Sequence, residues 1–97
     1  MENELILCAA IWYKISDLMN FQPKNIDKGF VISGYRHGSI ISSMSALGIK
    51  TNNTNSVQGF LTNKNRFLNR KEALDLVLKT KQCIPEYNDE LYSEDLY

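Results

Sequence analysis

The sequence predicts an α+β fold, in which a small antiparallel or mixed sheet of three or more strands carries two helices packed on it. Three observations support this fold class. Residues 5–13 form an unbroken apolar run rich in β-branched and aromatic residues, which is typical of a buried central strand. Residues 39–47 and 70–82 place apolar residues at helical spacing. The 97 residues suffice for one modest core, so we expect a single domain, 1–97.

The segment 14–28 separates the first strand from the next. It mixes charged and polar residues with a proline, a composition typical of a loop. Its isolated apolar residues are expected to tuck against the core: Leu18, Met19 and Phe21.

Two further strands are predicted at 29–35 and 57–62 from their β-branched and apolar residues. Between them, the helix at 39–47 has Ser39 as a candidate N-cap, and Gly48 follows its last turn. The order of elements is therefore strand, strand, helix, strand, helix.

The second helix has the strongest start signal in the chain. Asn69 and Glu72 have the spacing of a capping box, and Leu68 and Ala73 occupy the hydrophobic-staple positions. Pro85 follows its predicted end near Gln82. Its inward-facing residues are predicted to be Ala73, Leu74, Val77 and Leu78.

Charge and composition exclude several classes of protein. Eleven basic residues balance eleven acidic ones, so a protein that binds duplex nucleic acid through its overall charge is disfavoured. The longest apolar run is too short to span a bilayer, and an acidic N-terminus is unlike a secretory signal. We therefore expect a soluble protein in the cytoplasm. Cys8 and Cys83 have no metal-ligand spacing and are expected to be reduced core residues.

The C-terminal segment 83–97 holds five acidic residues and no basic one, whereas 61–82 holds six basic and two acidic residues. Leucine and tyrosine side chains also occur in this acidic segment. We expect it to dock, on its own chain or on a neighbouring one, although a solvated end is the alternative.

A first candidate binding site lies where the second strand meets the following helix. Arg36, His37 and Ser39 could bring a guanidinium, an imidazole and a hydroxyl to free backbone amides, a combination that suits phosphate. The alternative is equally open: Arg36 pairs with a carboxylate of the acidic tail, and His37 is a surface residue.

A second candidate site spans the segment before and into the capped helix. Phe60 and the guanidinium groups of Arg66 and Arg70 could stack on bases, while Asn65 could bind base edges. For the phenylalanines, burial in the core is the favoured alternative.

The sequence offers little for catalysis. It has a single histidine, no Ser-His-Asp spacing and no metal-binding cluster, so we expect neither a catalytic residue, nor a metal, nor a cofactor. A phosphodiesterase that uses Arg36 and His37 is the weaker alternative.

The order of five motifs resembles that of a group of small phage-encoded proteins. No single motif is specific, but together they span nearly the whole chain: Ala9 to Tyr13, Arg36-His37, Gln58 to Thr62, Asn65 to Ala73, and Ser93 to Tyr97. The named family to which the chain is most similar is the phage anti-Thoeris sponge proteins. These sequester cyclic ADP-ribose signals made by bacterial TIR-domain enzymes, and some members bind cyclic oligonucleotides.

The resemblance implies immune evasion by binding in the cytoplasm of the host cell. It implies a homo-oligomer, a dimer that can associate into a hexamer, with the cyclic nucleotide held between protomers. The ligand contacts it implies are Arg36, Phe60, Asn69 and Arg70. Without the resemblance, a small phage protein that inhibits a host enzyme by direct protein–protein interaction remains the alternative.

Overall fold

The described part of the chain forms a four-stranded sheet with two α-helices and a short 3₁₀ helix. The computed structural model describes residues 4–14, 17–48, 56–86 and 89–96. The elements in chain order are β1 (Ile6–Tyr13), β2 (Phe30–Gly34), α1 (His37–Ala46), β3 (Ser56–Thr62), β4 (Phe67–Asn69), α2 (Arg70–Thr80) and η2 (Ser93–Asp95). The strand order is β2-β1-β3-β4, and every neighbouring pair is antiparallel. The predicted α+β class is confirmed.

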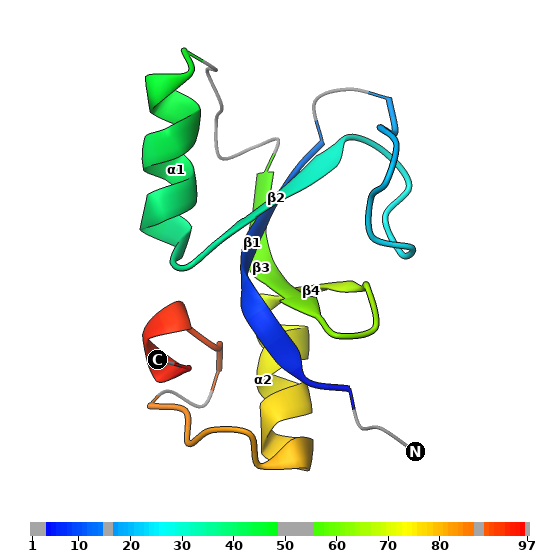
Figure 1. Cartoon of the computed structure of the whole chain (residues 1–97). Helices are drawn as coiled ribbons and strands as arrows, with labels where there is room; N and C mark the ends of the chain where they lie inside the picture. The colour runs from blue at the N-terminus through cyan, green and yellow to red at the C-terminus, as the bar shows by residue number, and fades with distance from the viewer. Residues whose placement is uncertain (1–3, 15–16, 49–55, 87–88, 97) are drawn as a thin grey trace.

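The two faces of the sheet carry separate apolar cores. On one face, the odd-numbered residues from Ala9 to Tyr13 pack with α1, α2 and the C-terminal segment. On the other face, Ala10 packs with Phe67 and with Ile26 of the segment 17–29. Figure 1 shows α1 and this segment on opposite sides of the sheet. The central strand β1 is therefore covered on both faces, as its continuous apolar run predicts.

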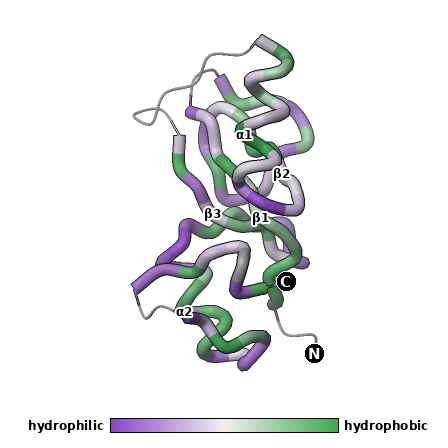
Figure 2. The backbone as a smooth tube through the Cα atoms, turned by 90° about the vertical axis from the view of Figure 1, so that its left-hand side faces the viewer, coloured by the Kyte–Doolittle hydropathy of each residue, from purple (hydrophilic) through white to green (hydrophobic). Residues whose placement is uncertain are grey.

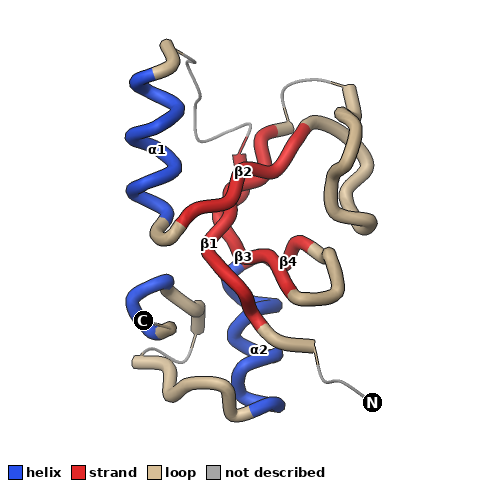
Figure 3. Tube along the Cα trace, in the orientation of Figure 1, coloured by secondary structure: helices blue, strands red, loops and turns tan. Residues whose placement is uncertain are grey.

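The segment 17–29 covers the second core through residues other than those predicted. Leu18 and Met19 are half exposed, and Phe21 is fully exposed with a left-handed φ of 63°. The prediction that these three side chains pack against the core is wrong. The buried side chains of this segment are those of Pro23 and Ile26. Figure 3 shows the segment as a loop beside the sheet.

Side-chain amides of this loop bind the outer edges of the sheet. Asn25 accepts a hydrogen bond from the Phe67 amide at 2.8 Å and donates to the Phe67 carbonyl at 2.6 Å. Gln22 accepts from the amide of Val31 at 2.8 Å. These bonds hold the loop to β4 and β2. Phe21 takes no part in them.

Side-chain amides also bind the backbone at the start of β1. Gln82 accepts from the Ile6 amide at 2.8 Å and donates to the Ile6 carbonyl at 2.7 Å. The Leu5 amide donates to the side-chain oxygen of Asn63 at 2.9 Å. Backbone groups that have no strand partner are thus satisfied by asparagine and glutamine side chains.

Helix α1 begins two residues earlier than the sequence predicts. The Arg36 carbonyl accepts from the amides of Ser39 and Ile40 at 3.1 and 3.3 Å, so Arg36 is the N-cap. The assignment of Ser39 as the cap is wrong, because Ser39 already lies in the first turn. Gly48, with φ 76°, follows the C-cap as predicted.

Helix α2 confirms the predicted capping box. The Asn69 side chain accepts from the Glu72 amide at 2.8 Å, and Glu72 accepts from the Asn69 amide at 3.0 Å. Of the four residues expected to face inward, Leu78 does not, because it is 56% exposed. The helix ends at Thr80, and Lys81 takes a left-handed conformation with φ 60°. In Figure 2 the helix carries both hydrophobic and hydrophilic residues, as a helix with one buried face does.

The acidic C-terminal segment docks on its own chain. Leu91 is completely buried in the first core, and its amide donates to the Arg70 carbonyl at 3.1 Å. Asp95 accepts from the amides of Tyr92 and Glu86 at 3.0 and 3.1 Å. The apolar residues of the tail thus anchor it beside the start of α2.

Both cysteines are half-buried and free. Burial raises the pKa of the Cys8 and Cys83 thiols, which disfavours the reactive thiolate.

Gly59 is predicted to be sensitive to substitution, because β3 and β4 approach each other closely there. A Cβ atom there would lie 2.0 Å from the Leu68 carbonyl oxygen and 2.8 Å from the Phe67 ring. We expect Gly59→Ala to lower the free energy of unfolding by about 3 kcal/mol, since β4 must move away. Urea denaturation measures this, with Gly38→Ala as the control because its Cβ meets no atom within 4 Å. Equal stability of Gly59→Ala and the natural protein would contradict the close strand contact.

Candidate functional site

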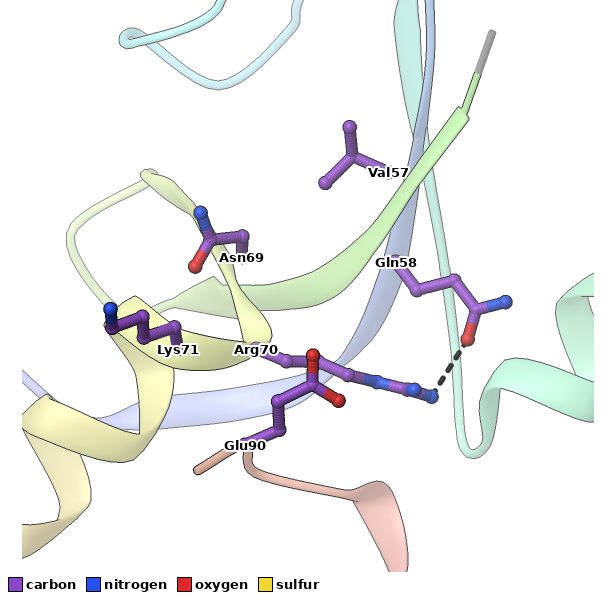
Figure 4. Close-up of a pocket in the computed structure, with 6 residues that line it drawn as sticks. All are labelled: Val57, Gln58, Asn69, Arg70, Lys71 and Glu90. Carbon is purple, nitrogen blue, oxygen red and sulfur yellow. Dashed lines mark hydrogen bonds between the residues drawn. The ribbon is translucent and has the colours of Figure 1, made fainter. Parts of the chain in front are cut away.

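A pocket of about 360 Å³ lies where β3, β4 and the start of α2 meet the C-terminal segment. Its volume falls in the range of small-molecule sites, roughly 300–1,000 Å³. Figure 4 shows Arg70 extending towards Gln58, with the carboxylate of Glu90 beside the Arg70 side chain. The lining residues are Val57, Gln58, Asn69, Arg70, Lys71 and Glu90.

Strand pairing places Arg70 in this pocket. In the pairing of β3 with β4, Asn69 lies opposite Gly59. Asn69 caps α2, so Arg70 is the first residue of the helix. The guanidinium of Arg70 then donates to Gln58 Oε1 at 2.7 Å, because Gln58 precedes Gly59 on β3.

His37 supports Arg70 from the start of α1. His37 is 95% buried, and its Nε2 lies 2.7 Å from the Gly59 carbonyl oxygen. A carbonyl oxygen only accepts, so Nε2 carries the proton. Nδ1 faces Arg70 Nη2 at 3.4 Å, and because a guanidinium only donates, Nδ1 is the acceptor. We therefore assign a neutral imidazole that donates to β3 and accepts from Arg70.

The other face of the Arg70 guanidinium meets the C-terminal segment. Its central carbon lies 4.7 Å from the centre of the Tyr92 ring. The Nε atom of Arg70 is buried and has no hydrogen-bond partner within the described part of the chain. A buried donor without an acceptor is costly. An acceptor-rich ligand that draws the guanidinium towards the pocket would relieve this cost.

The charges that line the pocket are mixed. Arg70 and Lys71 are basic, whereas Glu90 is acidic, which leaves one net positive charge among the lining side chains. The Tyr92 hydroxyl donates to Glu90 Oε2 at 3.2 Å, and this bond raises the pKa of Tyr92. The oxygen of the Asn69 amide is used by the helix cap, so its NH₂ group is the part that can donate to a ligand.

The structure brings some of the predicted site residues together. His37, Phe60 and Arg70 are neighbours, with the His37 and Phe60 rings edge to face at 5.1 Å between centres. Phe60 is completely buried and supports His37 from within the core, so its ring does not line the pocket. Asn69 does line it, beside Arg70.

The remaining predicted residues lie outside the pocket lining. Arg36 caps α1 and lies 5.2 Å from the centre of the Tyr35 ring, while Ser39 is exposed in the first turn of that helix. Asn65 and Arg66 belong to the turn between β3 and β4, where Asn65 is exposed with φ 57°.

Arg66 is engaged in an ion pair near the N-terminus. It donates to both carboxylate oxygens of Glu4, at 2.8 and 2.5 Å, and the Thr62 hydroxyl donates to the same carboxylate at 2.7 Å. The hydrogen bonds from Arg66 lower the pKa of Glu4 from 4.5 to about 2. Arg66 therefore ties the turn to the residue that precedes β1.

Five residues of the site were missing from the sequence-based set: Val57, Gln58, Lys71, Glu90 and Tyr92. Lys71 follows Arg70 at a helix start, which is a usable signal for an anion site. Glu90 and Tyr92 flank the buried Leu91, and the apolar residues of the acidic tail indicate docking without indicating where. Among the described residues, no group of three or more metal-ligating side chains gathers in one place.

The structure is a small α+β fold with a pocket of mixed charge at the start of a helix. A family model described as Phage T4 y16D protein matches residues 5–97, so the chain belongs to this phage protein family. The expectation of a small phage protein is confirmed, and the match carries no link to the anti-Thoeris sponge family. No curated protein and no solved structure matches the chain.

No helix in the described part of the chain combines the length and the apolar character needed to span a membrane.

The Glu4–Arg66 pair predicts how stability depends on pH. Because the folded pKa of Glu4 is about 2, below its ordinary 4.5, the ionised carboxylate stabilises the folded chain. This contribution is complete above about pH 5 and is lost as the pH falls towards 2. We expect Glu4→Gln to lower the free energy of unfolding by about 1 kcal/mol at pH 7 and to flatten the acid limb. Urea denaturation from pH 7 to pH 2 checks this, with Asp75→Asn as the control; an unchanged acid limb would contradict it.

Proposed function

We propose that the protein binds a cyclic nucleotide immune signal at the start of α2 and holds it without cleaving it. The signal would be a cyclic ADP-ribose isomer or a cyclic oligonucleotide. The observation that carries the proposal is the presence of Arg70 and Lys71 in one pocket of about 360 Å³. Sequestration of a host signal is a function suited to a phage protein, and it agrees with the sponge-like motif order of the sequence.

The groups in the pocket match the parts of a nucleotide. A guanidinium and an ammonium bind phosphate through charge-assisted hydrogen bonds. The amides of Gln58 and Asn69 can bind base edges or hydroxyls, and the stacked Arg70–Tyr92 pair offers a flat surface at which a base can pack. A local pair of cations is sufficient for one or two phosphates, which agrees with a chain of zero net charge.

Binding rather than cleavage is favoured by the state of His37. Both of its ring nitrogens are engaged, one with the Gly59 carbonyl and the other with Arg70. Its side chain is also buried. A general base must reach the proton that it removes, and this arrangement directs both nitrogens into the protein.

The proposal includes a homo-oligomer in the host cytoplasm, a dimer that can associate into a hexamer. Asn69 and Lys71 are exposed, so the pocket lies at the surface of the chain and a second protomer could complete it. Strand β1 is central and pairs on both sides, which leaves α2 as the better candidate for the interface.

A second candidate function is inhibition of a host enzyme by direct contact. It is favoured by an apolar hollow of about 430 Å³ lined by Val77, Leu78, Lys81, Cys83, Ile84 and Pro85. Ile84 is 94% exposed there, and the fully exposed Phe21 adds a second apolar point. Exposed apolar groups of this kind are typical of protein contact sites.

Thermal stability separates the two functions. A ligand that binds the folded chain raises the melting temperature, by an amount that corresponds to about 2.7 kcal/mol at one hundred times Kd. We expect a saturating cyclic ADP-ribose isomer, cyclic dinucleotide or cyclic trinucleotide to produce such a rise. Denaturing the complex should then return the ligand unchanged. A flat response to every compound would favour the protein-contact function, and a cleaved product would indicate an enzyme.

Arg70 is predicted to dominate ligand affinity. Loss of its charge-assisted contacts in Arg70→Ala should weaken binding of the responding nucleotide by at least about tenfold, as measured by titration calorimetry on fully folded protein. Lys79→Ala, on the last turn of the same helix, is the matched control and should bind normally. Arg36→Ala measured in parallel tests the other predicted phosphate site. Loss of affinity in Arg36→Ala alone would move the site to the start of α1.

A further inference from the structure

The negative charge of Glu90 is unfavourable for a site that binds phosphate alone. It lines the same pocket as Arg70 and Lys71, and Figure 4 shows its carboxylate at the Arg70 side chain. A bare phosphate would be repelled by this carboxylate. The pocket is therefore better matched to a ligand that carries both a phosphate and hydrogen-bond donors.

Glu90 is held in position by the two residues that follow it, Leu91 and Tyr92. Leu91, the next residue, is completely buried, and its amide donates to the Arg70 carbonyl at 3.1 Å. Tyr92 donates its hydroxyl to Glu90 Oε2 at 3.2 Å. The same Tyr92 ring lies against the Arg70 guanidinium, so one residue orients both the acidic and the basic group of the pocket.

We propose that Glu90 selects ribonucleotides by accepting a hydrogen bond from a ribose 2′-hydroxyl while Arg70 and Lys71 bind the phosphate. This inference rests on the proposed function and adds the class of sugar. An ionised carboxylate has no donor of its own, so the part of the ligand that faces it must supply one. In a nucleotide, the sugar hydroxyls are donors close to the phosphate. Carboxylates bind ribose hydroxyls in this way in dinucleotide-binding folds.

The test compares two matched pairs of probes that differ only at the sugar: cyclic AMP with its 2′-deoxy analogue, and cyclic di-AMP with its 2′-deoxy analogue. We expect the ribose form of at least one pair to bind about tenfold more tightly. Glu90→Gln should reduce that preference to about twofold and should strengthen binding of inorganic phosphate. Asp89→Asn, an exposed neighbour, is the matched control and should keep the preference. Circular dichroism melting confirms that each variant is folded.

Each remaining outcome has a distinct meaning. Equal binding of ribose and deoxyribose forms would overturn the role of Glu90 and leave the nucleotide-binding function intact. A ribose preference that survives Glu90→Gln would also overturn it. If ribose 5-phosphate also fails to bind while both sugar forms of a nucleotide bind equally, the base rather than the sugar is recognised, which overturns the role of Glu90. Absence of binding by every probe, together with a flat thermal response to the wider nucleotide panel, would overturn both proposals.

Discussion

The close contact between β3 and β4 at Gly59 is the constraint on which the site depends. The absence of a side chain at Gly59 allows the Leu68 backbone to approach β3. That approach sets the position of Asn69, which caps α2, and so determines where Arg70 leaves the helix. The carbonyl of Gly59 also receives the hydrogen bond from His37. One glycine thus positions the sheet edge, the start of α2 and the histidine that contacts Arg70.

Several residues of the shared motifs have a structural role. In the segment 58–62, Gly59 permits strand contact, Phe60 fills the core and Thr62 binds Glu4. Arg66 pairs with that same Glu4. The residues named in these motifs therefore stabilise the fold, whereas Arg70 and its neighbours line a pocket.

The sequence predicted the elements that have strong local signals. The apolar run of β1 and the capping box of α2 are recognisable without knowledge of their partners, and both are present. Strand β4 was missed because its three residues carry no periodicity and form a strand only by pairing with β3. Leu78 was wrongly predicted to face inward on α2. Helical spacing does not show how far the sheet extends beneath the helix.

The pocket was only partly predictable for a related reason. Arg70 was selected because a guanidinium can stack on bases, and Asn69 because the family resemblance implies it as a ligand contact. Glu90 and Tyr92 reach the same place through the docking of Leu91, a tertiary contact that composition does not specify. Segment 17–29 illustrates the same limit, because hydrogen bonds from its amides determine which of its apolar residues are buried.

The amide side chains at the sheet edges make the fold sensitive to slow chemical ageing. Asn25 uses both ends of its amide on Phe67, donating to the carbonyl and accepting from the N–H. Deamidation would replace the donor with a carboxylate oxygen, which would face the Phe67 carbonyl with charge of the same sign. Deamidation would thus remove one of the two hydrogen bonds between Asn25 and β4, the strand that leads into Arg70. The strand that precedes the pocket is thus held in part by the amide of one asparagine that does not line the pocket.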